Sequence, residues 1–422
     1  MSTVLLGLFL LGLLFILLVA VTTSAWMVYT WNTPESMAST RFPSRRAPRF
    51  SFSLLVPAYR EEHVLASTLE RLVAQRHPNV EIIPIVRSDD PGTAAVAYEM
   101  QDKYPTRIRV VEGDYSPRNK PAGMNMALPA CTGDIIGIFD AEDVVHEELL
   151  EYVDTLFQTS EATVVQSGVQ LINFWSNWFS ARNVLEYYFY FRSRLHFHAR
   201  AKFIPLGGNT VFIRRAVMER FGGWDDTCLA EDCDLGVRIS SHDYSVAVAY
   251  EPRLATREET PGTLNGFIKQ RTRWNQGFLQ VLAKGDWKRL PTRAQRILAV
   301  YTLAMPFFQA LTGLFIPVAL YMIFYVDLLL PIALLTFLPF SPLLLTLAME
   351  VVALHEFGAE FGYKVRARDY ARLIIGAPFY QLVLLYAAGR AVARHVRDDN
   401  SWEKTDHVGA HLRMDASQEA SL

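Results

Sequence analysis

The chain contains little cysteine and little charge. Cysteine occurs three times in 422 residues, at Cys131, Cys228 and Cys233, without a Cys-x-x-Cys pair or a nearby histidine cluster at zinc spacing. We therefore expect small, buried, reduced thiols. Charged residues make up only 20% of the chain and the formal net charge is −2, so the composition predicts no nucleic-acid partner.

Charge is absent from the first 34 residues. Within them, residues 4–29 supply the roughly 20 apolar positions that a membrane-spanning helix needs. A cleaved signal peptide is the alternative, but no basic segment precedes the apolar run and the run is too long. The sequence predicts an N-terminal transmembrane anchor over residues 1–34.

Two further apolar blocks lie near the other end. Residues 297–354 are interrupted only by Asp327 and Glu350, and their length suits two helices that turn near residues 326–330. Residues 373–393 carry a single charge, Arg390. We predict about three transmembrane helices over residues 297–393, hence about four in all, and a polar C-terminal tail over residues 394–422 that is disordered from about Met414.

Basic residues beside the apolar segments indicate orientation. One group follows the first segment and another lies between the third and the fourth: Arg41, Arg45, Arg46 and Arg49, then Lys364, Arg366 and Arg368. Both predict a multi-pass protein of the cell membrane whose central domain is cytoplasmic. The tail is also predicted to be cytoplasmic because it carries Arg390, Arg394, Arg397 and Lys404. Four spans would instead place the tail outside the cell. Either the last segment is re-entrant or interfacial, or the count is off by one.

Residues 50–262 alternate between strand and helix patterns. Short apolar runs predict strands at residues 52–56, 81–86, 108–112 and 135–139, and apolar spacing predicts helices at residues 61–75 and 93–103. Such alternation predicts an α/β, Rossmann-like domain with a mainly parallel sheet. Its ligand crevice should lie at the carboxyl ends of the strands.

Acidic residues stand at those ends. Asp89 and Asp90 follow the second strand, and Asp140 and Glu142 follow the strand at residues 135–139. Asp140 and Glu142 project from one turn and could share Mg²⁺ or Mn²⁺ with phosphate oxygens. Such an ion would offset the charge of a diphosphate leaving group. The alternative is that these acids only cap the helices that follow.

Lys120 lies in a loop with proline and glycine, before a short apolar helix around residues 124–128. A lysine there can reach a phosphate, although a solvated surface lysine is an equal alternative. Farther on, Trp224 offers a flat face of the kind on which sugars stack, and Asp232 precedes a predicted helix at residues 235–240. Asp232 can take the proton of an acceptor hydroxyl; for Asp234 we prefer a helix-capping role.

An amphipathic, arginine-rich segment follows at residues 263–293, which we predict to be an interfacial helix. It contains Gln270-Arg271-Thr272-Arg273-Trp274, where a guanidinium and an aromatic ring are suited to hold a diphosphate and a sugar near the membrane. Residues 173–200 are also dense in aromatic rings and arginines. They form either an interfacial helix or one that packs under the membrane spans.

The ordered motifs VPAYREE, NKPAGMN, FDAED, GGWDDTCLAEDCDLG and QRTRW resemble those of the family 2 inverting glycosyltransferases. The resemblance covers about residues 51–282. It is closer to the membrane-integrated branch, which includes cellulose, chitin and hyaluronan synthases and simpler glycolipid-forming hexosyltransferases. It implies a GT-A catalytic domain.

The resemblance also implies roles for a nucleotide-sugar site. Pro57, Tyr59 and Glu61 match the loop around the nucleotide base, and Asp89 or Asp90 matches the acid beside the nucleoside. Lys120 matches a lysine near the diphosphate. Asp140 matches the first acid of the metal-binding Asp-x-Asp motif; Glu142 stands at the second position in place of Asp, so Asp143 remains an alternative ligand.

The remaining motifs imply the catalytic groups. Asp232, after Glu231, matches the general base of a Thr-Glu-Asp motif in which Ala230 replaces threonine, and Gln270, Arg273 and Trp274 match Gln-x-x-Arg-Trp. The implied reaction is a single inverting displacement on a nucleotide-diphosphate sugar, with a UDP-sugar favoured and a lipid or glycan acceptor. Transfer of one hexose to a lipid, a processive polysaccharide synthase and a non-catalytic membrane scaffold or transporter remain the hypotheses. Oligomeric state is not predicted.

Overall fold

The structure is a computed structural model, which describes residues 3–30, 45–326, 330–336 and 340–403. Several predictions lie outside these residues. They concern Arg41, the centre of the predicted turn at residues 327–329, and the tail from Lys404 with its expected disorder.

A seven-stranded sheet forms the centre of the molecule, in the order β3-β2-β1-β4-β7-β5-β8. β1 pairs in parallel with β2 and β4, and β2 in parallel with β3. The strands are β1 (Phe52–Pro57), β2 (Val80–Val86), β3 (Val111–Glu112), β4 (Ile135–Ile138), β5 (Val164–Ser167), β7 (Val211–Arg214) and β8 (Val246–Ala249). The four predicted strands are all present, although β3 is shorter than expected.

The second half of the sheet is mixed. β7 runs antiparallel to both β4 and β5, whereas β5 and β8 are parallel. A separate two-stranded sheet joins β6 (Val169–Leu171) and β9 (Thr256–Glu258) in parallel. The predicted α/β class is confirmed, and the reversed strand β7 is the feature that the strand and helix alternation did not predict.

Both faces of the sheet are covered because successive strand side chains point to opposite sides. Leu54 and Val56 belong to the core beneath one layer of helices, and Leu55 to the core on the other side. The first layer has α3 (Leu65–Val73), α4 (Pro91–Lys103) and α6 (Leu149–Thr159); the second has α5 (Lys120–Ala127), α7 (Ser180–Phe189), α8 (Leu195–Arg200), α9 (Arg215–Phe221) and α10 (Glu231–Ser241).

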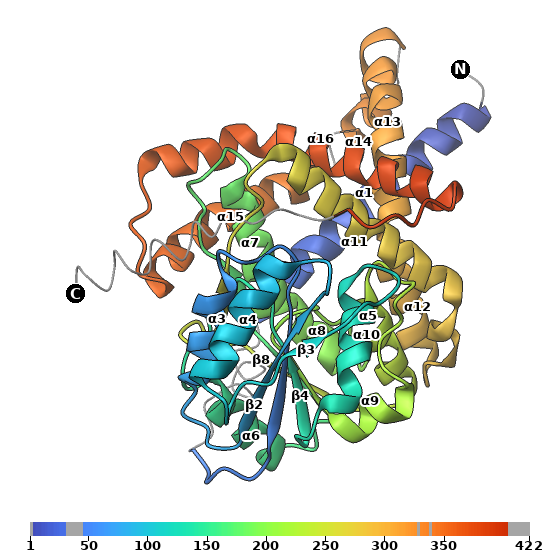
Figure 1. Cartoon of the computed structure of the whole chain (residues 1–422). Coiled ribbons are helices and arrows are strands. Elements are labelled where there is room, and N and C mark those ends of the chain that lie inside the picture. The colour runs from blue at the N-terminus through green and yellow to red at the C-terminus, as the bar shows by residue number, and fades with distance from the viewer. Residues whose placement is uncertain (1–2, 31–44, 327–329, 337–339, 404–422) are drawn as a thin grey trace.

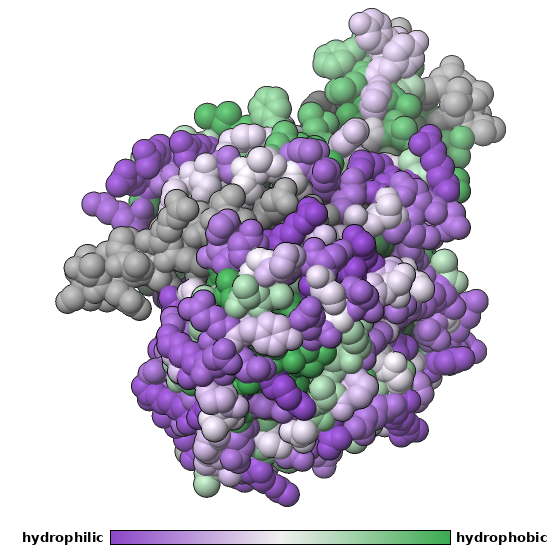
Figure 2. All heavy atoms as spheres, in the orientation of Figure 1, coloured by the Kyte–Doolittle hydropathy of each residue, from purple (hydrophilic) through white to green (hydrophobic). Residues whose placement is uncertain are grey.

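Most of the remaining helices gather at one end of the molecule, where α1 and α13 project away from the sheet, whereas α12 lies beside α10 (Figure 1). The remaining helices are α1 (Thr3–Val28), α11 (Leu264–Lys284), α12 (Arg293–Leu303), α13 (Met305–Tyr325), α14 (Leu330–Leu335), α15 (Phe340–Glu360) and α16 (Ala367–Val396). Hydrophobic side chains gather on the projecting part (Figure 2). This distribution of hydrophobic side chains indicates that the chain associates with a membrane.

Three helices in the described parts of the chain are long and apolar enough to cross a membrane: Leu6–Val28, Met305–Met322 and Ala367–Val396. About four were predicted. The other expected helix, α15, carries Glu350 at its middle and Glu356 and Glu360 in its last turns. α13 ends at Tyr325, which agrees with the predicted break after the second segment.

The basic residues that follow the first apolar segment in the sequence contact the catalytic domain. Arg45 pairs with Glu148 beside α6, and the backbone N–H of Arg49 donates to Asp154 (2.7 Å). The guanidinium of Arg194 lies 4.2 Å from the ring of Trp26. Basic residues do meet the end of α1, but they come from the region of α7 and α8.

The aromatic segment at residues 173–200 forms α7 and α8, joined by a π-helical turn (Tyr190–Arg194). Tyr188 is buried, and its ring lies 6.0 Å from that of Phe357 on α15. Arg192 pairs with Glu360 at 2.7 Å. The segment therefore packs under the C-terminal helices, the second of the two alternatives.

Candidate active site

Two carboxylates open helix α10. Glu231 is its first residue, and Asp232 accepts a hydrogen bond from the N–H of Cys233 (2.7 Å). A Cβ at Gly208 would lie 3.0 Å from Asp232 Oδ2, so the glycine allows the chain to pass beside the carboxylate. A small cavity of about 10 Å³ adjoins both acids and Trp224. Because Trp224 is only 5% exposed, its ring is a wall of the core and not the open stacking face that was predicted.

The surroundings of this pair favour proton uptake. Burial and the neighbouring Asp232 raise the pKa of Glu231 to about 7, against the opposing charges of Lys120 and Arg273. Burial also raises the pKa of Asp232, while the Cys233 N–H, Lys120 and Arg273 oppose the shift. A carboxylate with a raised pKa is a better general base near neutral pH.

Lys120 connects the acids of two loops. Its Nζ lies 2.5 Å from Asp140 Oδ1 and donates to the carbonyl of Gly208 (2.8 Å). Burial opposes the charged ammonium, but Asp140 and Glu231 offset it and raise the pKa of Lys120. The solvated alternative for Lys120 is wrong, since the side chain lies in this cluster with 22% exposure.

The acids in the loop after β4 have different surroundings. Asp143 accepts the N–H of Asp140 (2.8 Å) at one oxygen and the side-chain amide of Asn209 (2.9 Å) at the other. Asn209 also donates to Glu258 on β9. Burial, then Glu258 and Asp140, raise the pKa of Asp143. Asp143 therefore stabilises the conformation of the loop, whereas the carboxylate of Asp140 pairs with Lys120.

The candidate metal ligands are Asp140 and Glu142. Within the described ranges no three His, Cys, Asp or Glu side chains are grouped to hold an ion. Mg²⁺ is commonly bound by one or two carboxylates completed by substrate phosphates and water. Asp140, with a side chain that is 32% exposed, and the buried Glu142 lie on one turn and are the two carboxylates available for that pattern.

The two acids after β2 also differ. Asp90 is the N-cap of α4 and accepts the N–H of Arg60 (2.5 Å), so it holds the loop that follows β1. Asp89 instead faces an open pocket of about 410 Å³, where it pairs with Arg87 (2.8 Å) and Arg118 (3.1 Å). The pocket is lined by Arg87, Asp89, Asp114, Tyr115, Ser116 and Arg118.

The loop after β1 reaches the same region. Pro57 ends β1, and the N–H of Glu61 donates to Thr93 at the start of α4 (3.0 Å). Tyr59 stands between them in the sequence. Burial raises the pKa of Tyr115 and Arg87 opposes the shift, while Asp89 and then Tyr59 add to it. The sequence motif therefore lies near the pocket, although none of Pro57, Tyr59 and Glu61 is among its lining residues.

Helix α11 carries the Gln-Arg-Trp motif. Its N-cap Thr263 accepts the N–H of Gly266 (3.1 Å). In the part of the chain that the structure describes, Gln270 Oε1 and Arg273 Nε are buried without a hydrogen-bond partner. The charge of Arg273 acts on both Glu231 and Asp232. An unpartnered guanidinium nitrogen beside these acids is suited to receive an anionic ligand.

Trp274 is held by its neighbours. The guanidinium of Arg271 lies 4.7 Å from the Trp274 ring and pairs with Glu186 (2.5 Å). The Tyr187 ring lies 6.1 Å from Trp274. Burial and then Glu258 raise the pKa of Tyr187, and Asp140 and Arg273 act on it too, so Tyr187 lies between the acidic loop and α11.

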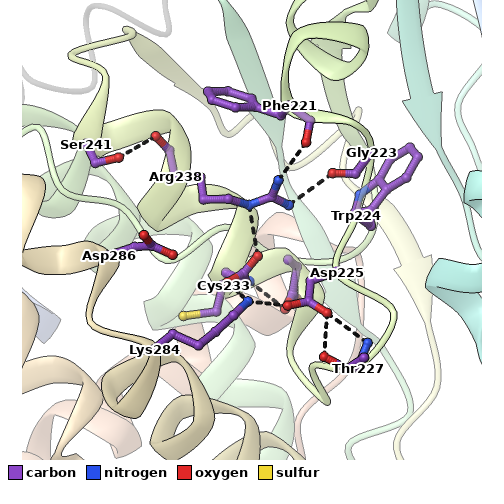
Figure 3. Close-up of polar contacts among 12 residues, drawn as sticks. Phe221, Gly223, Trp224, Asp225, Thr227, Cys233, Arg238, Ser241, Lys284 and Asp286 are labelled. Atoms are coloured by element: carbon purple, nitrogen blue, oxygen red, sulfur yellow. Dashed lines mark hydrogen bonds and ion pairs between the residues drawn. The ribbon is translucent and has the colours of Figure 1, made fainter.

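Helices α10 and α11 are joined by a polar network (Figure 3). Lys284 pairs with both Asp225 and Asp234, and Arg238 donates to Asp234 (2.9 Å) and to the carbonyl of Gly223 (3.0 Å). The predicted capping role of Asp234 is wrong: α10 begins at Glu231, with Ala230 as N-cap. Asp234, 1% exposed, instead ties the first turn of α10 to α11.

The structure brings Lys120, Asp140, Glu231 and Asp232 together and places Arg273 within electrostatic reach. It adds groups that the sequence did not single out: Arg87, Tyr115, Tyr187, Asn209 and Glu258. Asn209 follows the Gly-Gly pair beside Asp232, and that position was the one signal that could have found it.

Comparisons with known proteins bear on the family and the fold of the chain. Residues 48–277 match the model of the family described as glycosyltransferase like family 2. A probable glycosyltransferase, YdaM, of Bacillus subtilis is 28% identical over 244 residues, which are 55% of this chain and 56% of YdaM. A beta-monoglucosyldiacylglycerol synthase of Synechocystis is 28% identical over 233 residues, 54% of this chain and 47% of that protein.

A poly-beta-1,6-N-acetyl-D-glucosamine synthase of Staphylococcus epidermidis is 24% identical over 269 residues, 63% of this chain and 62% of that protein. The chain spans about half the length of the first two relatives. A mannosyltransferase of Pyrobaculum calidifontis, solved with GDP-Man and Mn²⁺, has the same fold, with a TM-score of 0.57 and 18% identity over 91% of this chain and 99% of that one. Because the family model matches more than half of the sequence, this chain belongs to glycosyltransferase like family 2.

Proposed function

We propose that the protein is a membrane-bound inverting glycosyltransferase. It transfers a hexose from a nucleotide-diphosphate sugar to a lipid acceptor at the cytoplasmic face of the cell membrane and forms a β-linkage. One observation carries the proposal: Lys120 joins Asp140, at the end of β4, to the Gly208 carbonyl beside Asp232. A cation for phosphate and a base for the acceptor therefore lie in one cluster.

The donor subsite extends to the pocket at Asp89. Uracil presents one N–H donor between two carbonyl acceptors. A carboxylate between two guanidinium groups has the complementary order, one acceptor group between two donor groups. Asp89 between Arg87 and Arg118 has that order. This supports a UDP-sugar as donor.

Asp140 and Glu142 would hold Mg²⁺ or Mn²⁺ together with the diphosphate. Asp143 is the poorer candidate because both of its oxygens already accept hydrogen bonds. When bound, the ion would stabilise the charge of the leaving diphosphate. Lys120 and Arg273 add positive charge to the same group.

Asp232 is the general base of the proposed reaction. It takes the proton of the acceptor hydroxyl as that oxygen bonds to the anomeric carbon, while the bond from that carbon to the diphosphate breaks on the opposite side. Glu231 keeps Asp232 basic through its neighbouring charge. The acceptor side of the site consists of Gln270, Trp274 and Tyr187, which orient the acceptor hydroxyl.

The relative named as a beta-monoglucosyldiacylglycerol synthase favours a lipid acceptor, and the poly-beta-1,6-N-acetyl-D-glucosamine synthase makes a processive synthase the second candidate. The test uses membranes containing the full chain, Mg²⁺ or Mn²⁺, and a panel of radiolabelled nucleotide sugars. We expect a lipid-extractable monoglycoside. A high-mass polymer would replace the first candidate with the second, and no transfer from any donor would contradict both.

A further inference from the structure

Helix α16 exposes an apolar stripe. Ile375, Phe379, Leu382 and Tyr386 are 68%, 59%, 56% and 62% exposed, and their spacing of four, three and four residues places them along one side of a helix. The other side of the helix is buried, and it carries Leu373, Tyr380, Ala387 and Ala391. By length and hydropathy alone, α16 is a candidate span.

The beginning of α16 contacts the catalytic domain. Arg372 donates to the carbonyl of Trp175 (3.2 Å), and Arg182 on α7 donates to the carbonyl of Ala377 (3.3 Å). A Cβ at Gly376 would lie 3.4 Å from the Trp178 side chain. The first turns of α16 therefore lie on the segment that leads into α7.

The rest of α16 follows α11. The ring of Tyr380 lies 5.4 Å from that of Phe267, and Thr272 donates to the carbonyl of Ala387 (3.5 Å). Just beyond the helix, the carbonyl of Asp399 accepts from Gln276 (2.6 Å) and the side chain of Asn400 from Gln280 (2.8 Å). Figure 1 shows α16 lying across the domain above α11, whereas α1 and α13 project away.

These contacts are incompatible with a span. A helix of 30 residues is about 45 Å long, so one that crosses a hydrocarbon core of about 30 Å has its ends on opposite sides. The beginning of α16 instead contacts the catalytic domain, and its end contacts α11, which is itself fixed to α10 of that domain. Its middle meets α13, where a Cβ at Gly313 would lie 3.4 Å from Leu385, so the helix that carries the exposed stripe touches a candidate span.

We propose that α16 does not cross the bilayer but lies in its surface, with Ile375, Phe379, Leu382 and Tyr386 inserted among the lipid chains. An amphipathic helix binds a membrane surface in this way. α16 then forms a layer between lipid and α11, the helix that carries Trp274. The proposal also places Arg390, Arg394 and Arg397 on the side of the catalytic domain, as their charge predicts.

Cysteine labelling tests the side of the membrane. Arg397→Cys reports the end of α16, and Asp102→Cys, exposed on α4, is the matched control in the catalytic domain; the native Cys131, Cys228 and Cys233 are buried, and the unmodified chain gives the background. We expect both variants to react equally with an impermeant maleimide, in intact and in permeabilised cells. Labelling of only one of them in intact cells would overturn the proposal, whatever the transferase activity.

Depth measurements test the orientation. Spin labels at positions 375, 382 and 386 span 11 residues, or about 16 Å along a helix. In liposomes of the full chain, a helix in the membrane surface gives the three labels similar depths, as measured by collision with oxygen and a water-soluble relaxant. A steady change of depth by about 16 Å across the series would show that α16 spans the bilayer and would refute the proposal.

Discussion

At the scale of single residues, the proposed chemistry depends on two adjacent acids, Glu231 and Asp232. Asp232 lies beside Gly208 and the Lys120 cluster, so its carboxylate can face an acceptor hydroxyl. We expect Asp232→Asn to lower the rate of transfer by roughly 10²- to 10⁴-fold, the usual contribution of a general base, while nucleotide binding persists. Labelled sugar transfer and a nucleotide thermal-shift assay measure the two effects.

The control for this variant is Asp243→Asn. Asp243 follows α10 and its side chain is 58% exposed, so the substitution should leave transfer unchanged. Substantial turnover in Asp232→Asn would assign the base to another residue. A variant that also fails to bind nucleotide would indicate a loss of structure and would withdraw the assignment of a purely chemical role.

Glu231 gives the reaction a pH dependence. Because its pKa is raised to about 7 by burial and by Asp232, Glu231 is protonated below that pH and charged above it. Its charge makes Asp232 more basic, so we expect kcat/KM to rise as the pH increases through about 7. Glu231→Gln should remove this rise, and a pH profile of kcat/KM that is the same in both proteins would contradict the role.

At the scale of elements, α11 carries residues of the proposed acceptor side and also fixes α10. Gly277 lies against the residue before α10, since a Cβ there would be 2.6 Å from the nitrogen of Ala230. Gln280 accepts the N–H of Leu229 (2.8 Å), and Lys284 pairs with Asp234. One side of α11 therefore sets the distance between Arg273 and the acids of α10.

Gly277→Ala tests this packing. Helix propensity alone predicts a gain of about 1 kcal/mol for Gly→Ala inside a helix. Contact with Ala230 should outweigh this gain in stability, so that the substitution destabilises the protein by about 1–3 kcal/mol, the usual cost of overpacking. Gly389→Ala in α16 is the matched control, because nothing lies within 4 Å of its added Cβ.

Thermal unfolding in detergent compares the two glycine variants. We expect a lower Tm for Gly277→Ala and an unchanged or higher Tm for Gly389→Ala. Loss of transfer should accompany only the first variant. Equal Tm values for the two would mean that α11 does not rest on the backbone before α10.

At the scale of the whole molecule, buried ion pairs connect the catalytic domain to the C-terminal helices. Arg182 on α7 pairs with Glu350 on α15, and their side chains are only 7% and 10% exposed. Removal of one partner leaves a buried charge alone, so Arg182→Met should destabilise the chain by about 3–5 kcal/mol. The double variant Arg182→Met, Glu350→Leu should lose less than the sum of the single variants.

A cycle of unfolding measurements in detergent tests this coupling. Lys103→Met is the control, because the Lys103–Glu70 pair is about half exposed and such pairs contribute about 0–1 kcal/mol. Additive losses in the cycle would show that Arg182 and Glu350 act independently and that the two parts are held together by apolar packing.

Much of the fold could be predicted because it depends on local pattern. The strands at residues 52–56 and 135–139 are short buried apolar runs, and β1 and β4 occupy almost those positions. The reversal of β7 could not be predicted, since its pairing with β4 and β5 joins residues about 75 and 47 positions apart. A parallel strand and an antiparallel strand can have the same apolar pattern in a sequence.

The family, the apolar helices and several of the candidate site residues could be predicted because motif order and hydropathy are properties of neighbouring residues. The fold sets how these side chains are used. It separates Asp89 from Asp90 and commits Asp143 to hydrogen bonds within its loop, and it lays α16 along α11. These outcomes depend on burial and on contacts between distant segments, which composition and spacing do not contain.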